Sequence, residues 1–190
     1  MALRTRFALA LAALLCLVAA PPLDARAPKV FLTTDEALEL AFPECEVTRE
    51  TVYLTKEQKK RAEKLAGKEL ESSLVYLYTA TKDGKLVGHA FFDTHKVRTK
   101  RETVMIAVDP KARVARIEVL AFAEPEEYLP RGNWYAQFLG KELNDKLRIK
   151  RDIRGVAGAT MTANVTTEAV RRTLALHRVI TETSGAAANG

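Results

Sequence analysis

The chain has 190 residues, of which 47% are hydrophobic, 28% charged and 7% aromatic, and its formal charge is +6. This length and composition fit one domain with its own hydrophobic core, and they exclude an intrinsically disordered chain and a large multidomain enzyme. The surplus of basic residues is too small to indicate nucleic-acid binding, and we expect none.

Residues 1–27 have the layout of a secretory signal peptide. Arg4 and Arg6 precede an apolar run, Ala8–Ala20, that is short for a transmembrane helix, and small residues follow it. We therefore predict export and a periplasmic or other extracytoplasmic location, with a retained membrane anchor as the alternative. Without this segment the formal charge falls to +4 and Cys45 is the only cysteine. An internal disulfide then cannot stabilise the domain.

The N-terminal part of the mature chain has the pattern of a helix, a strand and a second helix. Two threonines and two acidic residues at 33–36 are typical of a capped helix start, and Pro43 ends the apolar run that follows. Residues 46–54 are rich in β-branched side chains and predict a strand. Thr55 and Gln58 then form a capping-box pattern that opens the second helix.

Four further strands follow along the chain. Apolar runs at 74–80 and 86–92 flank Asp83-Gly84, which is the strongest short signal for a β-hairpin. Residues 103–108 and 114–122 also predict strands, and in the second of them polar and apolar residues alternate, as in a strand with one packed face. The sequence thus predicts a single α+β domain in which an antiparallel sheet of about four or five strands packs against helices.

The segment from Glu124 to Leu143 changes character. Pro125 and Pro130 enforce an irregular backbone, and the aromatic residues after them recur at about helical spacing. This pattern predicts a short amphipathic helix. Trp134 in it either packs on the core, together with Phe138, or flanks a cofactor.

An amphipathic helix is predicted to end near Ile180, and a run of small residues and threonines, GVAGATMTAN at 155–164, leads into it. The apolar positions on one helical face are Val165, Ala169, Leu176, Val179 and Ile180, with Arg171 and Arg178 on the opposite, solvent-facing side.

We place the start of this helix at about Thr162–Thr166. Small residues before it allow a ligand to approach the backbone, and the free amides of a helix N-terminus favour a phosphate. A threonine-rich capping loop without any ligand has the same spacing, so both readings stay open at this point. The sequence lacks the glycines and the lysine of a Walker loop at the required places, and it also lacks the glycine pattern of a dinucleotide fingerprint.

Gly158, Ala159 and Thr160, with Thr162 and the helix that follows, resemble the flavinylation motif of the FMN-binding domain family. That family includes the flavin-bearing C subunit of the sodium-pumping NADH:quinone reductase and the G subunit of the Rnf complex. The preceding segment, EPEEYLPRGNWYAQFLGKEL, is similar to the family's segment before the motif. Two positions depart from the motif, because Ala157 stands where Ser or Thr is usual and Arg154 stands where Asp is expected. The resemblance covers roughly residues 74–180.

The resemblance implies a covalent cofactor and a carrier function. In the family, an FAD:protein FMN transferase attaches FMN to the hydroxyl of the last Thr of the motif, which is Thr160 here. The chain would then be an exported electron carrier with FMN in a phosphoester, shuttling electrons between membrane or periplasmic redox proteins at the outer face of the membrane, with no catalytic residue of its own. The division of the chain is a signal peptide (1–27), a helix–strand–helix extension (28–72), an FMN-binding domain (73–183) and a disordered tail (184–190).

The resemblance also implies further cofactor contacts around Thr160. These are Gly158, Ala159, Thr162, His89, Arg98, Thr99, Glu124, Tyr128 and Trp134. An arginine in a basic run such as VRTKR is also typical of a solvated strand end, so a structural role stays open for Arg98. The three histidines and Cys45 show no metal-ligand spacing, and we expect no metal.

Two other functions fit the same residues. The first is an exported module without redox chemistry, which binds a phosphate or another anion at the loop Gly158–Thr162. The second is a flavin-dependent reductase of a small molecule, which differs from a carrier in having a substrate pocket.

Overall fold

The computed structural model describes the backbone of residues 28–188 and the side chains of residues 28–183. The predicted signal peptide, residues 1–27, lies outside the described residues. Among the helices of the part that is described, none is both long and apolar enough to cross a membrane.

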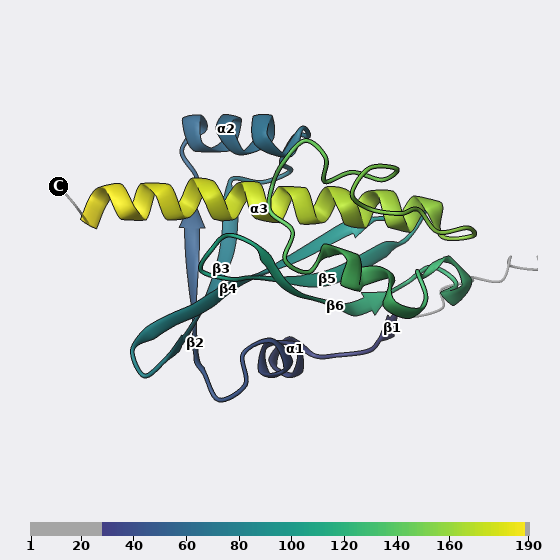
Figure 1. Ribbon diagram of the computed structural model, residues 1–190, viewed down its shortest axis with the longest axis horizontal. Helices are drawn as coiled ribbons and strands as arrows, with labels where there is room; N and C mark the ends of the chain where they lie inside the picture. The colour runs from purple at the N-terminus through teal and green to yellow at the C-terminus, as the bar shows by residue number, and fades with distance from the viewer. Residues whose placement is uncertain (1–27, 189–190) are drawn as a thin grey trace, which may run out of the picture.

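The fold is built on one antiparallel sheet of six strands in the order β1-β6-β5-β4-β3-β2 (Figure 1). The strands are β1 (Lys29–Val30), β2 (Glu46–Tyr53), β3 (Leu74–Lys82), β4 (Lys85–Lys96), β5 (Arg101–Val108) and β6 (Val114–Phe122). The α+β prediction is confirmed, with one strand more than the four or five expected. The extra strand is β1, whose two residues are too few to produce a periodic sequence pattern.

The hairpin between β3 and β4 has the turn that its sequence predicts. Asp83 and Gly84 both have positive φ, of 52° and 70°. A two-residue type I′ turn requires positive φ at both of its central positions, which explains the Asp-Gly pair.

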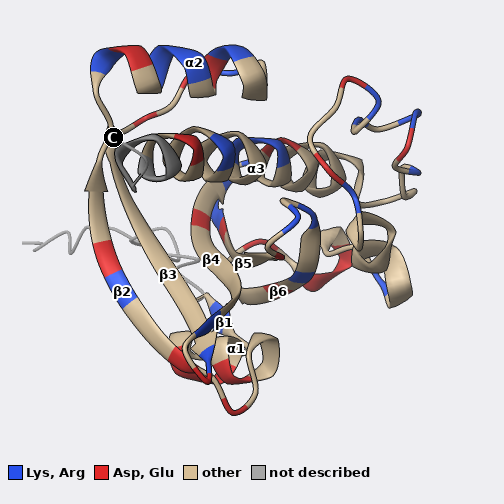
Figure 2. Cartoon of the chain, turned by 60° about the vertical axis from the view of Figure 1, so that its left-hand side comes forward, with Lys and Arg blue, Asp and Glu red and all other residues tan. Residues whose placement is uncertain are grey.

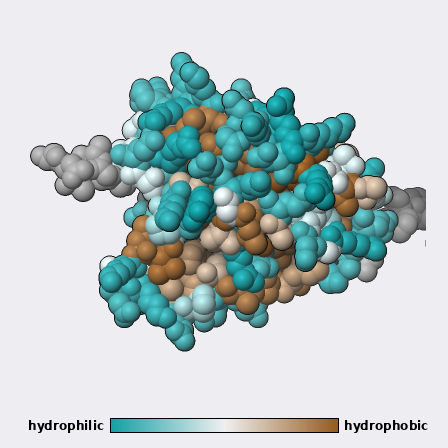
Figure 3. All heavy atoms as spheres, viewed as in Figure 1, coloured by the Kyte–Doolittle hydropathy of each residue, from teal (hydrophilic) through white to brown (hydrophobic). Residues whose placement is uncertain are grey.

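Helices cover both faces of the sheet (Figure 1). On one face lie α2 (Lys56–Ala66) and α3 (Thr160–Ala188), and on the other lies α1 (Thr34–Ala41). Thr33 with Glu36 and Thr55 with Gln58 form the capping boxes of α1 and α2, as the sequence predicts. The space-filling view shows mostly hydrophilic atoms over α2 and hydrophobic atoms nearer the sheet (Figure 3).

The long helix α3 occupies the centre of the molecule, between the sheet and α2 (Figure 1). It begins at Thr160, two residues before the predicted range of Thr162–Thr166, and its backbone stays helical to Ala188. It therefore runs past the predicted end near Ile180 and through residues 184–188 of the predicted tail.

Arg171 does not lie on a solvent-facing side of α3, and that prediction is wrong. Its side chain is buried, and the guanidinium donates hydrogen bonds to the backbone carbonyls of Leu65, Ala66, Asn144 and Leu147. The reason is that α2 and the loop around residues 144–147 cover the outer side of α3, so the helix has partners on both sides.

The segment after β6 also differs from its prediction. In place of a short amphipathic α-helix it forms two 3₁₀ helices, η1 (Glu126–Tyr128) and η2 (Gly132–Phe138). Gly132 has a φ of 63° and Asn133 departs from helical geometry, so a regular helix cannot continue through them. Trp134 and Phe138 are nevertheless buried in the main core.

We predict that Arg171→Ala lowers the free energy of unfolding by about 3 kcal/mol, because four backbone carbonyl groups, two of them in buried hydrogen bonds, lose a charged donor at once. Urea unfolding followed by circular dichroism measures this loss. Arg151→Ala, at an exposed position, is the control and should change stability by no more than about 0.5 kcal/mol. Equal effects of the two variants would contradict the structural role of Arg171.

Candidate functional site

A pocket of about 190 Å³ lies at the N-terminus of α3. Its wall combines residues 158–162 with Arg98, from the turn between β4 and β5, and Tyr128, from η1. The structure thus brings together six of the residues that the sequence singles out, namely Arg98, Tyr128, Gly158, Ala159, Thr160 and Thr162. Met161 completes the lining and is 51% exposed.

Thr160 is the first residue of α3 and is exposed at the pocket. Its hydroxyl donates a hydrogen bond of 3.2 Å to the carbonyl of Val156. Backbone N–H groups in the first turn of a helix have no partner within the helix, and the helix dipole places partial positive charge there. An oxygen of Thr160 that carried a phosphate would therefore lie beside groups that stabilise negative charge.

Gly158 provides the left-handed backbone conformation through which the chain enters α3. Its φ is +82°, in the left-handed region that favours glycine, while a Cβ added there would meet no atom within 4 Å. The requirement for glycine is thus conformational and not steric. Next to it, Ala159 is buried and its carbonyl accepts the backbone N–H of Ala163.

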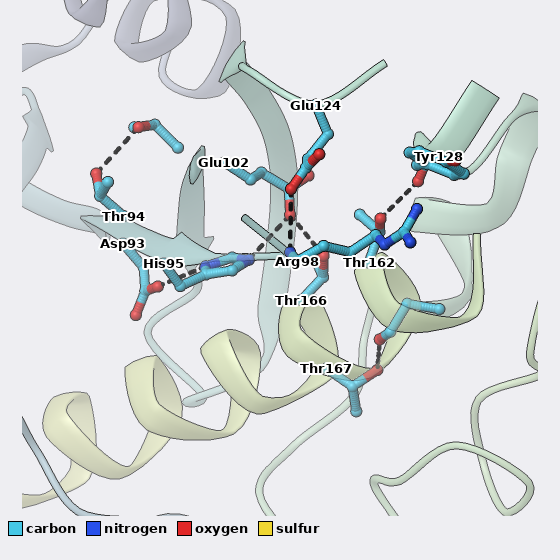
Figure 4. Close-up of polar contacts among 12 residues, drawn as sticks. Asp93, Thr94, His95, Arg98, Glu102, Glu124, Tyr128, Thr162, Thr166 and Thr167 are labelled. Atoms are coloured by element: carbon cyan, nitrogen blue, oxygen red, sulfur yellow. Dashed lines mark hydrogen bonds and ion pairs between the residues drawn. The ribbon is translucent and has the colours of Figure 1, made fainter. Parts of the chain in front are cut away.

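Thr162 and Arg98 both contact Tyr128, which lies on the other side of the pocket from α3. Thr162 is fully buried, and its hydroxyl donates a hydrogen bond of 2.5 Å to the carbonyl of Tyr128. The Arg98 guanidinium lies 4.6 Å from the centre of the Tyr128 ring, within cation–π distance. Arg98 therefore contributes a positive charge to the pocket, whereas Thr162 holds α3 against η1 (Figure 4).

Glu124 and Thr99 lie behind the pocket and position Arg98. One carboxylate oxygen of Glu124 accepts hydrogen bonds from the backbone N–H groups of Arg98, Thr99 and Lys100 and from the Thr99 hydroxyl. Burial by itself raises the pKa of Glu124, but these hydrogen bonds outweigh it and hold the pKa below its ordinary value. Glu124 thus stays ionised and fixes the turn that carries Arg98.

His89 and Trp134 do not line this pocket. His89, on β4, lies with its Nδ1 3.2 Å from Nε2 of His177 on α3. Burial, with a smaller contribution from His89, lowers the pKa of His177 to about 4. Trp134 is buried, and its indole N–H donates a hydrogen bond of 2.7 Å to the carbonyl of Arg154, which holds the segment before the motif. A cofactor contact for either residue stays a prediction.

A buried ionic network lies next to the pocket, and the sequence alone did not predict it (Figure 4). The Glu102 carboxylate, fully buried on β5, accepts hydrogen bonds from Nε2 of His95 at 2.9 Å and from the hydroxyls of Thr166 at 2.9 Å and Tyr135 at 3.2 Å. Nδ1 of His95 bonds Asp93 at 2.8 Å.

Asp93 extends this network to α3, because Arg172 binds its carboxylate through two nitrogens, at 2.8 and 3.0 Å. Burial by itself lowers the pKa of His95, but the hydrogen bonds to Asp93 and Glu102 outweigh it and raise the pKa to about 9. The network therefore contains an imidazolium between two carboxylates. The sequence could have indicated one pair of the network through the register of the β4–β5 hairpin, in which His95 and Glu102 face each other.

A second, larger cleft of about 380 Å³ opens beside this network. Strands β3 and β4 pair only between residues 78–82 and 85–90, and beyond that point they separate. The cleft lies between their separated ends, α3 and the loop after α2, and Asp93, His95 and Arg172 contribute to its lining. In residues 28–183, no group of three or more His, Cys, Asp or Glu side chains could hold a metal ion.

Residues 99–175 match the model of the family described as the FMN-binding domain. The matched range includes Thr99, Glu124, Tyr128, Trp134 and the loop 158–162, while Arg98 and His89 precede it. No curated protein and no solved structure matches the chain.

We predict that stability falls on the alkaline side because of His95. Its pKa is about 9 in the folded protein against 6.5 as the ordinary value, so its stabilising charge is fully present below pH 6.5 and is lost as the pH rises through 9. The free energy of unfolding should drop by up to about 3 kcal/mol over this range. Urea titrations between pH 6.5 and 9.5 measure it, and in His95→Gln the slope should flatten. An unchanged slope would contradict the imidazolium assignment.

We predict the opposite behaviour for His177. Its folded pKa of about 4 lies below the ordinary 6.5, so the neutral ring stabilises the fold above pH 6.5, and this contribution is lost as the pH falls toward 4. The pKa of Asp93 is also lowered, so its ionised form adds to the stability that is lost as the pH falls. Thermal unfolding between pH 7 and 4 should therefore show a smaller loss of Tm in His177→Leu than in the parent protein. The loss of stability above pH 6.5, which depends on His95, should be the same in both.

Proposed function

Because the chain contains an FMN-binding domain, matched over residues 99–175, we propose that it is an exported electron-transfer flavoprotein that carries FMN in a phosphoester on Thr160. The domain supports a flavin-binding, electron-transfer role. The observation that carries the finer proposal is the exposed hydroxyl of Thr160 at the first residue of α3, inside a pocket that also holds the Arg98 guanidinium.

The residues at this pocket fit the phosphate end of FMN. The first-turn amides of α3 and the Arg98 guanidinium offset its negative charge, and the small residues at 157–159 leave the backbone accessible. When bound, FMN supplies one-electron and two-electron redox chemistry. The role of the chain is then to hold the cofactor, with Thr160 as the attachment point and no substrate chemistry of its own.

Attachment is a group transfer onto the Thr160 oxygen. In the reaction of an FAD:protein FMN transferase, the Thr160 hydroxyl loses its proton and forms an O–P bond to the FMN phosphorus. The pyrophosphate bond of FAD breaks, and AMP leaves with the displaced oxygen. The hydrogen bond from Thr160 to Val156 must open during this step, because the hydroxyl proton is then lost.

The size of the pocket favours a covalent bond over reversible binding. Pockets that retain small molecules by contact alone enclose about 300–1,000 Å³, whereas this pocket measures about 190 Å³. A covalent bond also suits an exported protein, because a dissociable flavin would be lost to the medium. We propose the transferase and membrane or periplasmic redox proteins as partners.

The two departures from the motif concern recognition by the transferase. The backbone of Arg154 is fixed, since its carbonyl accepts from Trp134 and its N–H donates to the side chain of Gln137. Both Arg154 and Ala157 are exposed, so a modifying enzyme can reach them. Their substitution therefore changes the surface presented to the transferase and not the path of the loop.

One observation favours the reductase as a second candidate. The cleft of about 380 Å³ contains His95, a protonated group next to a space large enough for a small molecule. The module that binds only an anion has no comparable support beyond the pocket at α3. If the purified protein contained no flavin and bound inorganic phosphate, this result would favour the anion-binding module.

We predict that co-expression with the transferase raises the intact mass by the mass of FMN minus water, and that Thr160→Ala abolishes the increase. Thr160→Ser keeps a hydroxyl and should retain the adduct. The matched control is Thr51→Ala, at an exposed threonine of β2, which should leave the adduct unchanged. An increase that survives in Thr160→Ala would contradict attachment at this residue.

A further inference from the structure

The loop at residues 144–154, here called the basic loop, concentrates positive charge. It holds five Lys and Arg residues against two Asp residues. All five cations are exposed, and none forms an ion pair with a residue of the described part of the chain. They are Lys146, Arg148, Lys150, Arg151 and Arg154. In Figure 2 blue segments follow this loop, at the end of α3 away from the C-terminus.

The basic loop is firmly anchored. Leu147 and Ile153 are fully buried, and the Arg171 guanidinium holds the carbonyls of Asn144 and Leu147. The backbone N–H of Lys150 donates to the carbonyl of Ile153 at 2.9 Å. Unpaired like charges repel and destabilise a compact fold, so the buried anchors hold five cations in place at a cost in stability.

The basic loop continues directly into the site. Arg154, its last residue, is held by Trp134, and five residues separate it from Thr160 at the start of α3. At the pocket itself, Met161 exposes half of its surface beside the Arg98 cation. The surface around Thr160 therefore combines one exposed apolar side chain with the Arg98 cation, and the basic loop leads into it along the chain. An apolar contact with charge around it is typical of a protein interface with a polar rim.

We propose that the basic loop, with Met161 and Arg98, is the docking surface for an acidic redox protein. This inference rests on the proposed function, because docking here would bring a partner next to a flavin on Thr160. Positive charge on the loop would attract an acidic partner and orient it toward the pocket. A lipid surface is a poorer fit, since the apolar residues of the loop are buried or half-buried and none projects for insertion.

Two forms of one electron acceptor test the charge of the partner. Native cytochrome c is basic, and cytochrome c with succinylated lysines is acidic while keeping its haem. The FMN-loaded protein is reduced with dithionite, freed of excess reductant and mixed with either ferric form in a stopped-flow instrument. Two ferric haems each accept one electron, and the reduced flavin releases two electrons and two protons.

We expect the acidic form to react at least 10-fold faster than the basic form at low ionic strength. The preference should shrink as salt screens the charges. The variant Lys150→Glu/Arg151→Glu should slow the acidic form at low salt and leave the rates at high salt unchanged. The control, Lys56→Glu/Lys60→Glu, makes the same change of charge at the first turns of α2 and should leave the preference intact.

Four results would overturn the proposal or the function on which it rests. Equal rates for the two cytochromes at low salt, or a preference that survives the loop variant, would overturn docking while the flavin function stands. Sedimentation with phosphatidylglycerol vesicles that depends on Lys150 and Arg151, without a preference between cytochromes, would assign the loop to a membrane. A protein that gains no FMN mass would overturn the proposed function itself, and docking with it.

Discussion

The buried carboxylate of Glu102 is the constraint around which the other parts are arranged. A carboxylate without solvent is costly unless charges and hydrogen bonds surround it, and here His95, Thr166 and Tyr135 provide them. These partners belong to β4, α3 and η2, so neutralising one charge on β5 fixes three other elements. Burial, with the charge of Glu102, raises the pKa of Tyr135, which therefore remains a protonated donor.

This network determines how the candidate site is held. It joins α3, which begins with Thr160, to the two strands whose connecting turn carries Arg98. Glu124 then fixes the turn, and Thr162 fixes the first turn of α3 against η1. The pocket consequently has a rigid wall on each side, although its own volume is small. Rigid placement would matter for the proposed carrier function, because the distance from the cofactor to a partner must be reproducible.

Local sequence signals predicted most of the elements and the central part of the site. The capping boxes at Thr33 and Thr55, the Asp83-Gly84 turn and the loop 158–162 each depend on residues within a few positions of one another. Such signals can be found in a single sequence because the interactions they describe are local.

Pairings between distant segments could not be found in the same way. His95 and Glu102 face each other only once the register of β4 and β5 is known, and Thr166 reaches Glu102 only once α3 is placed on the sheet. A single apolar stripe predicts a single packed side and a solvent-facing Arg171, whereas the structure buries this residue. Nothing local indicates that α2 and the basic loop would cover the other side.

The same arrangement explains why a cofactor would be anchored at an end of α3 and not within the core. The interior of the fold is committed to packing and to the buried ionic network, which leaves no large apolar cavity at the site. Thr160 lies where the helix meets solvent, so a group attached there would keep an exposed edge. Electron transfer to another protein needs such an edge, and an enclosed pocket would remove it. Under the proposed function, a covalent anchor combined with a charged, rigid surface would meet two requirements at once: retention of the cofactor and access for its partner.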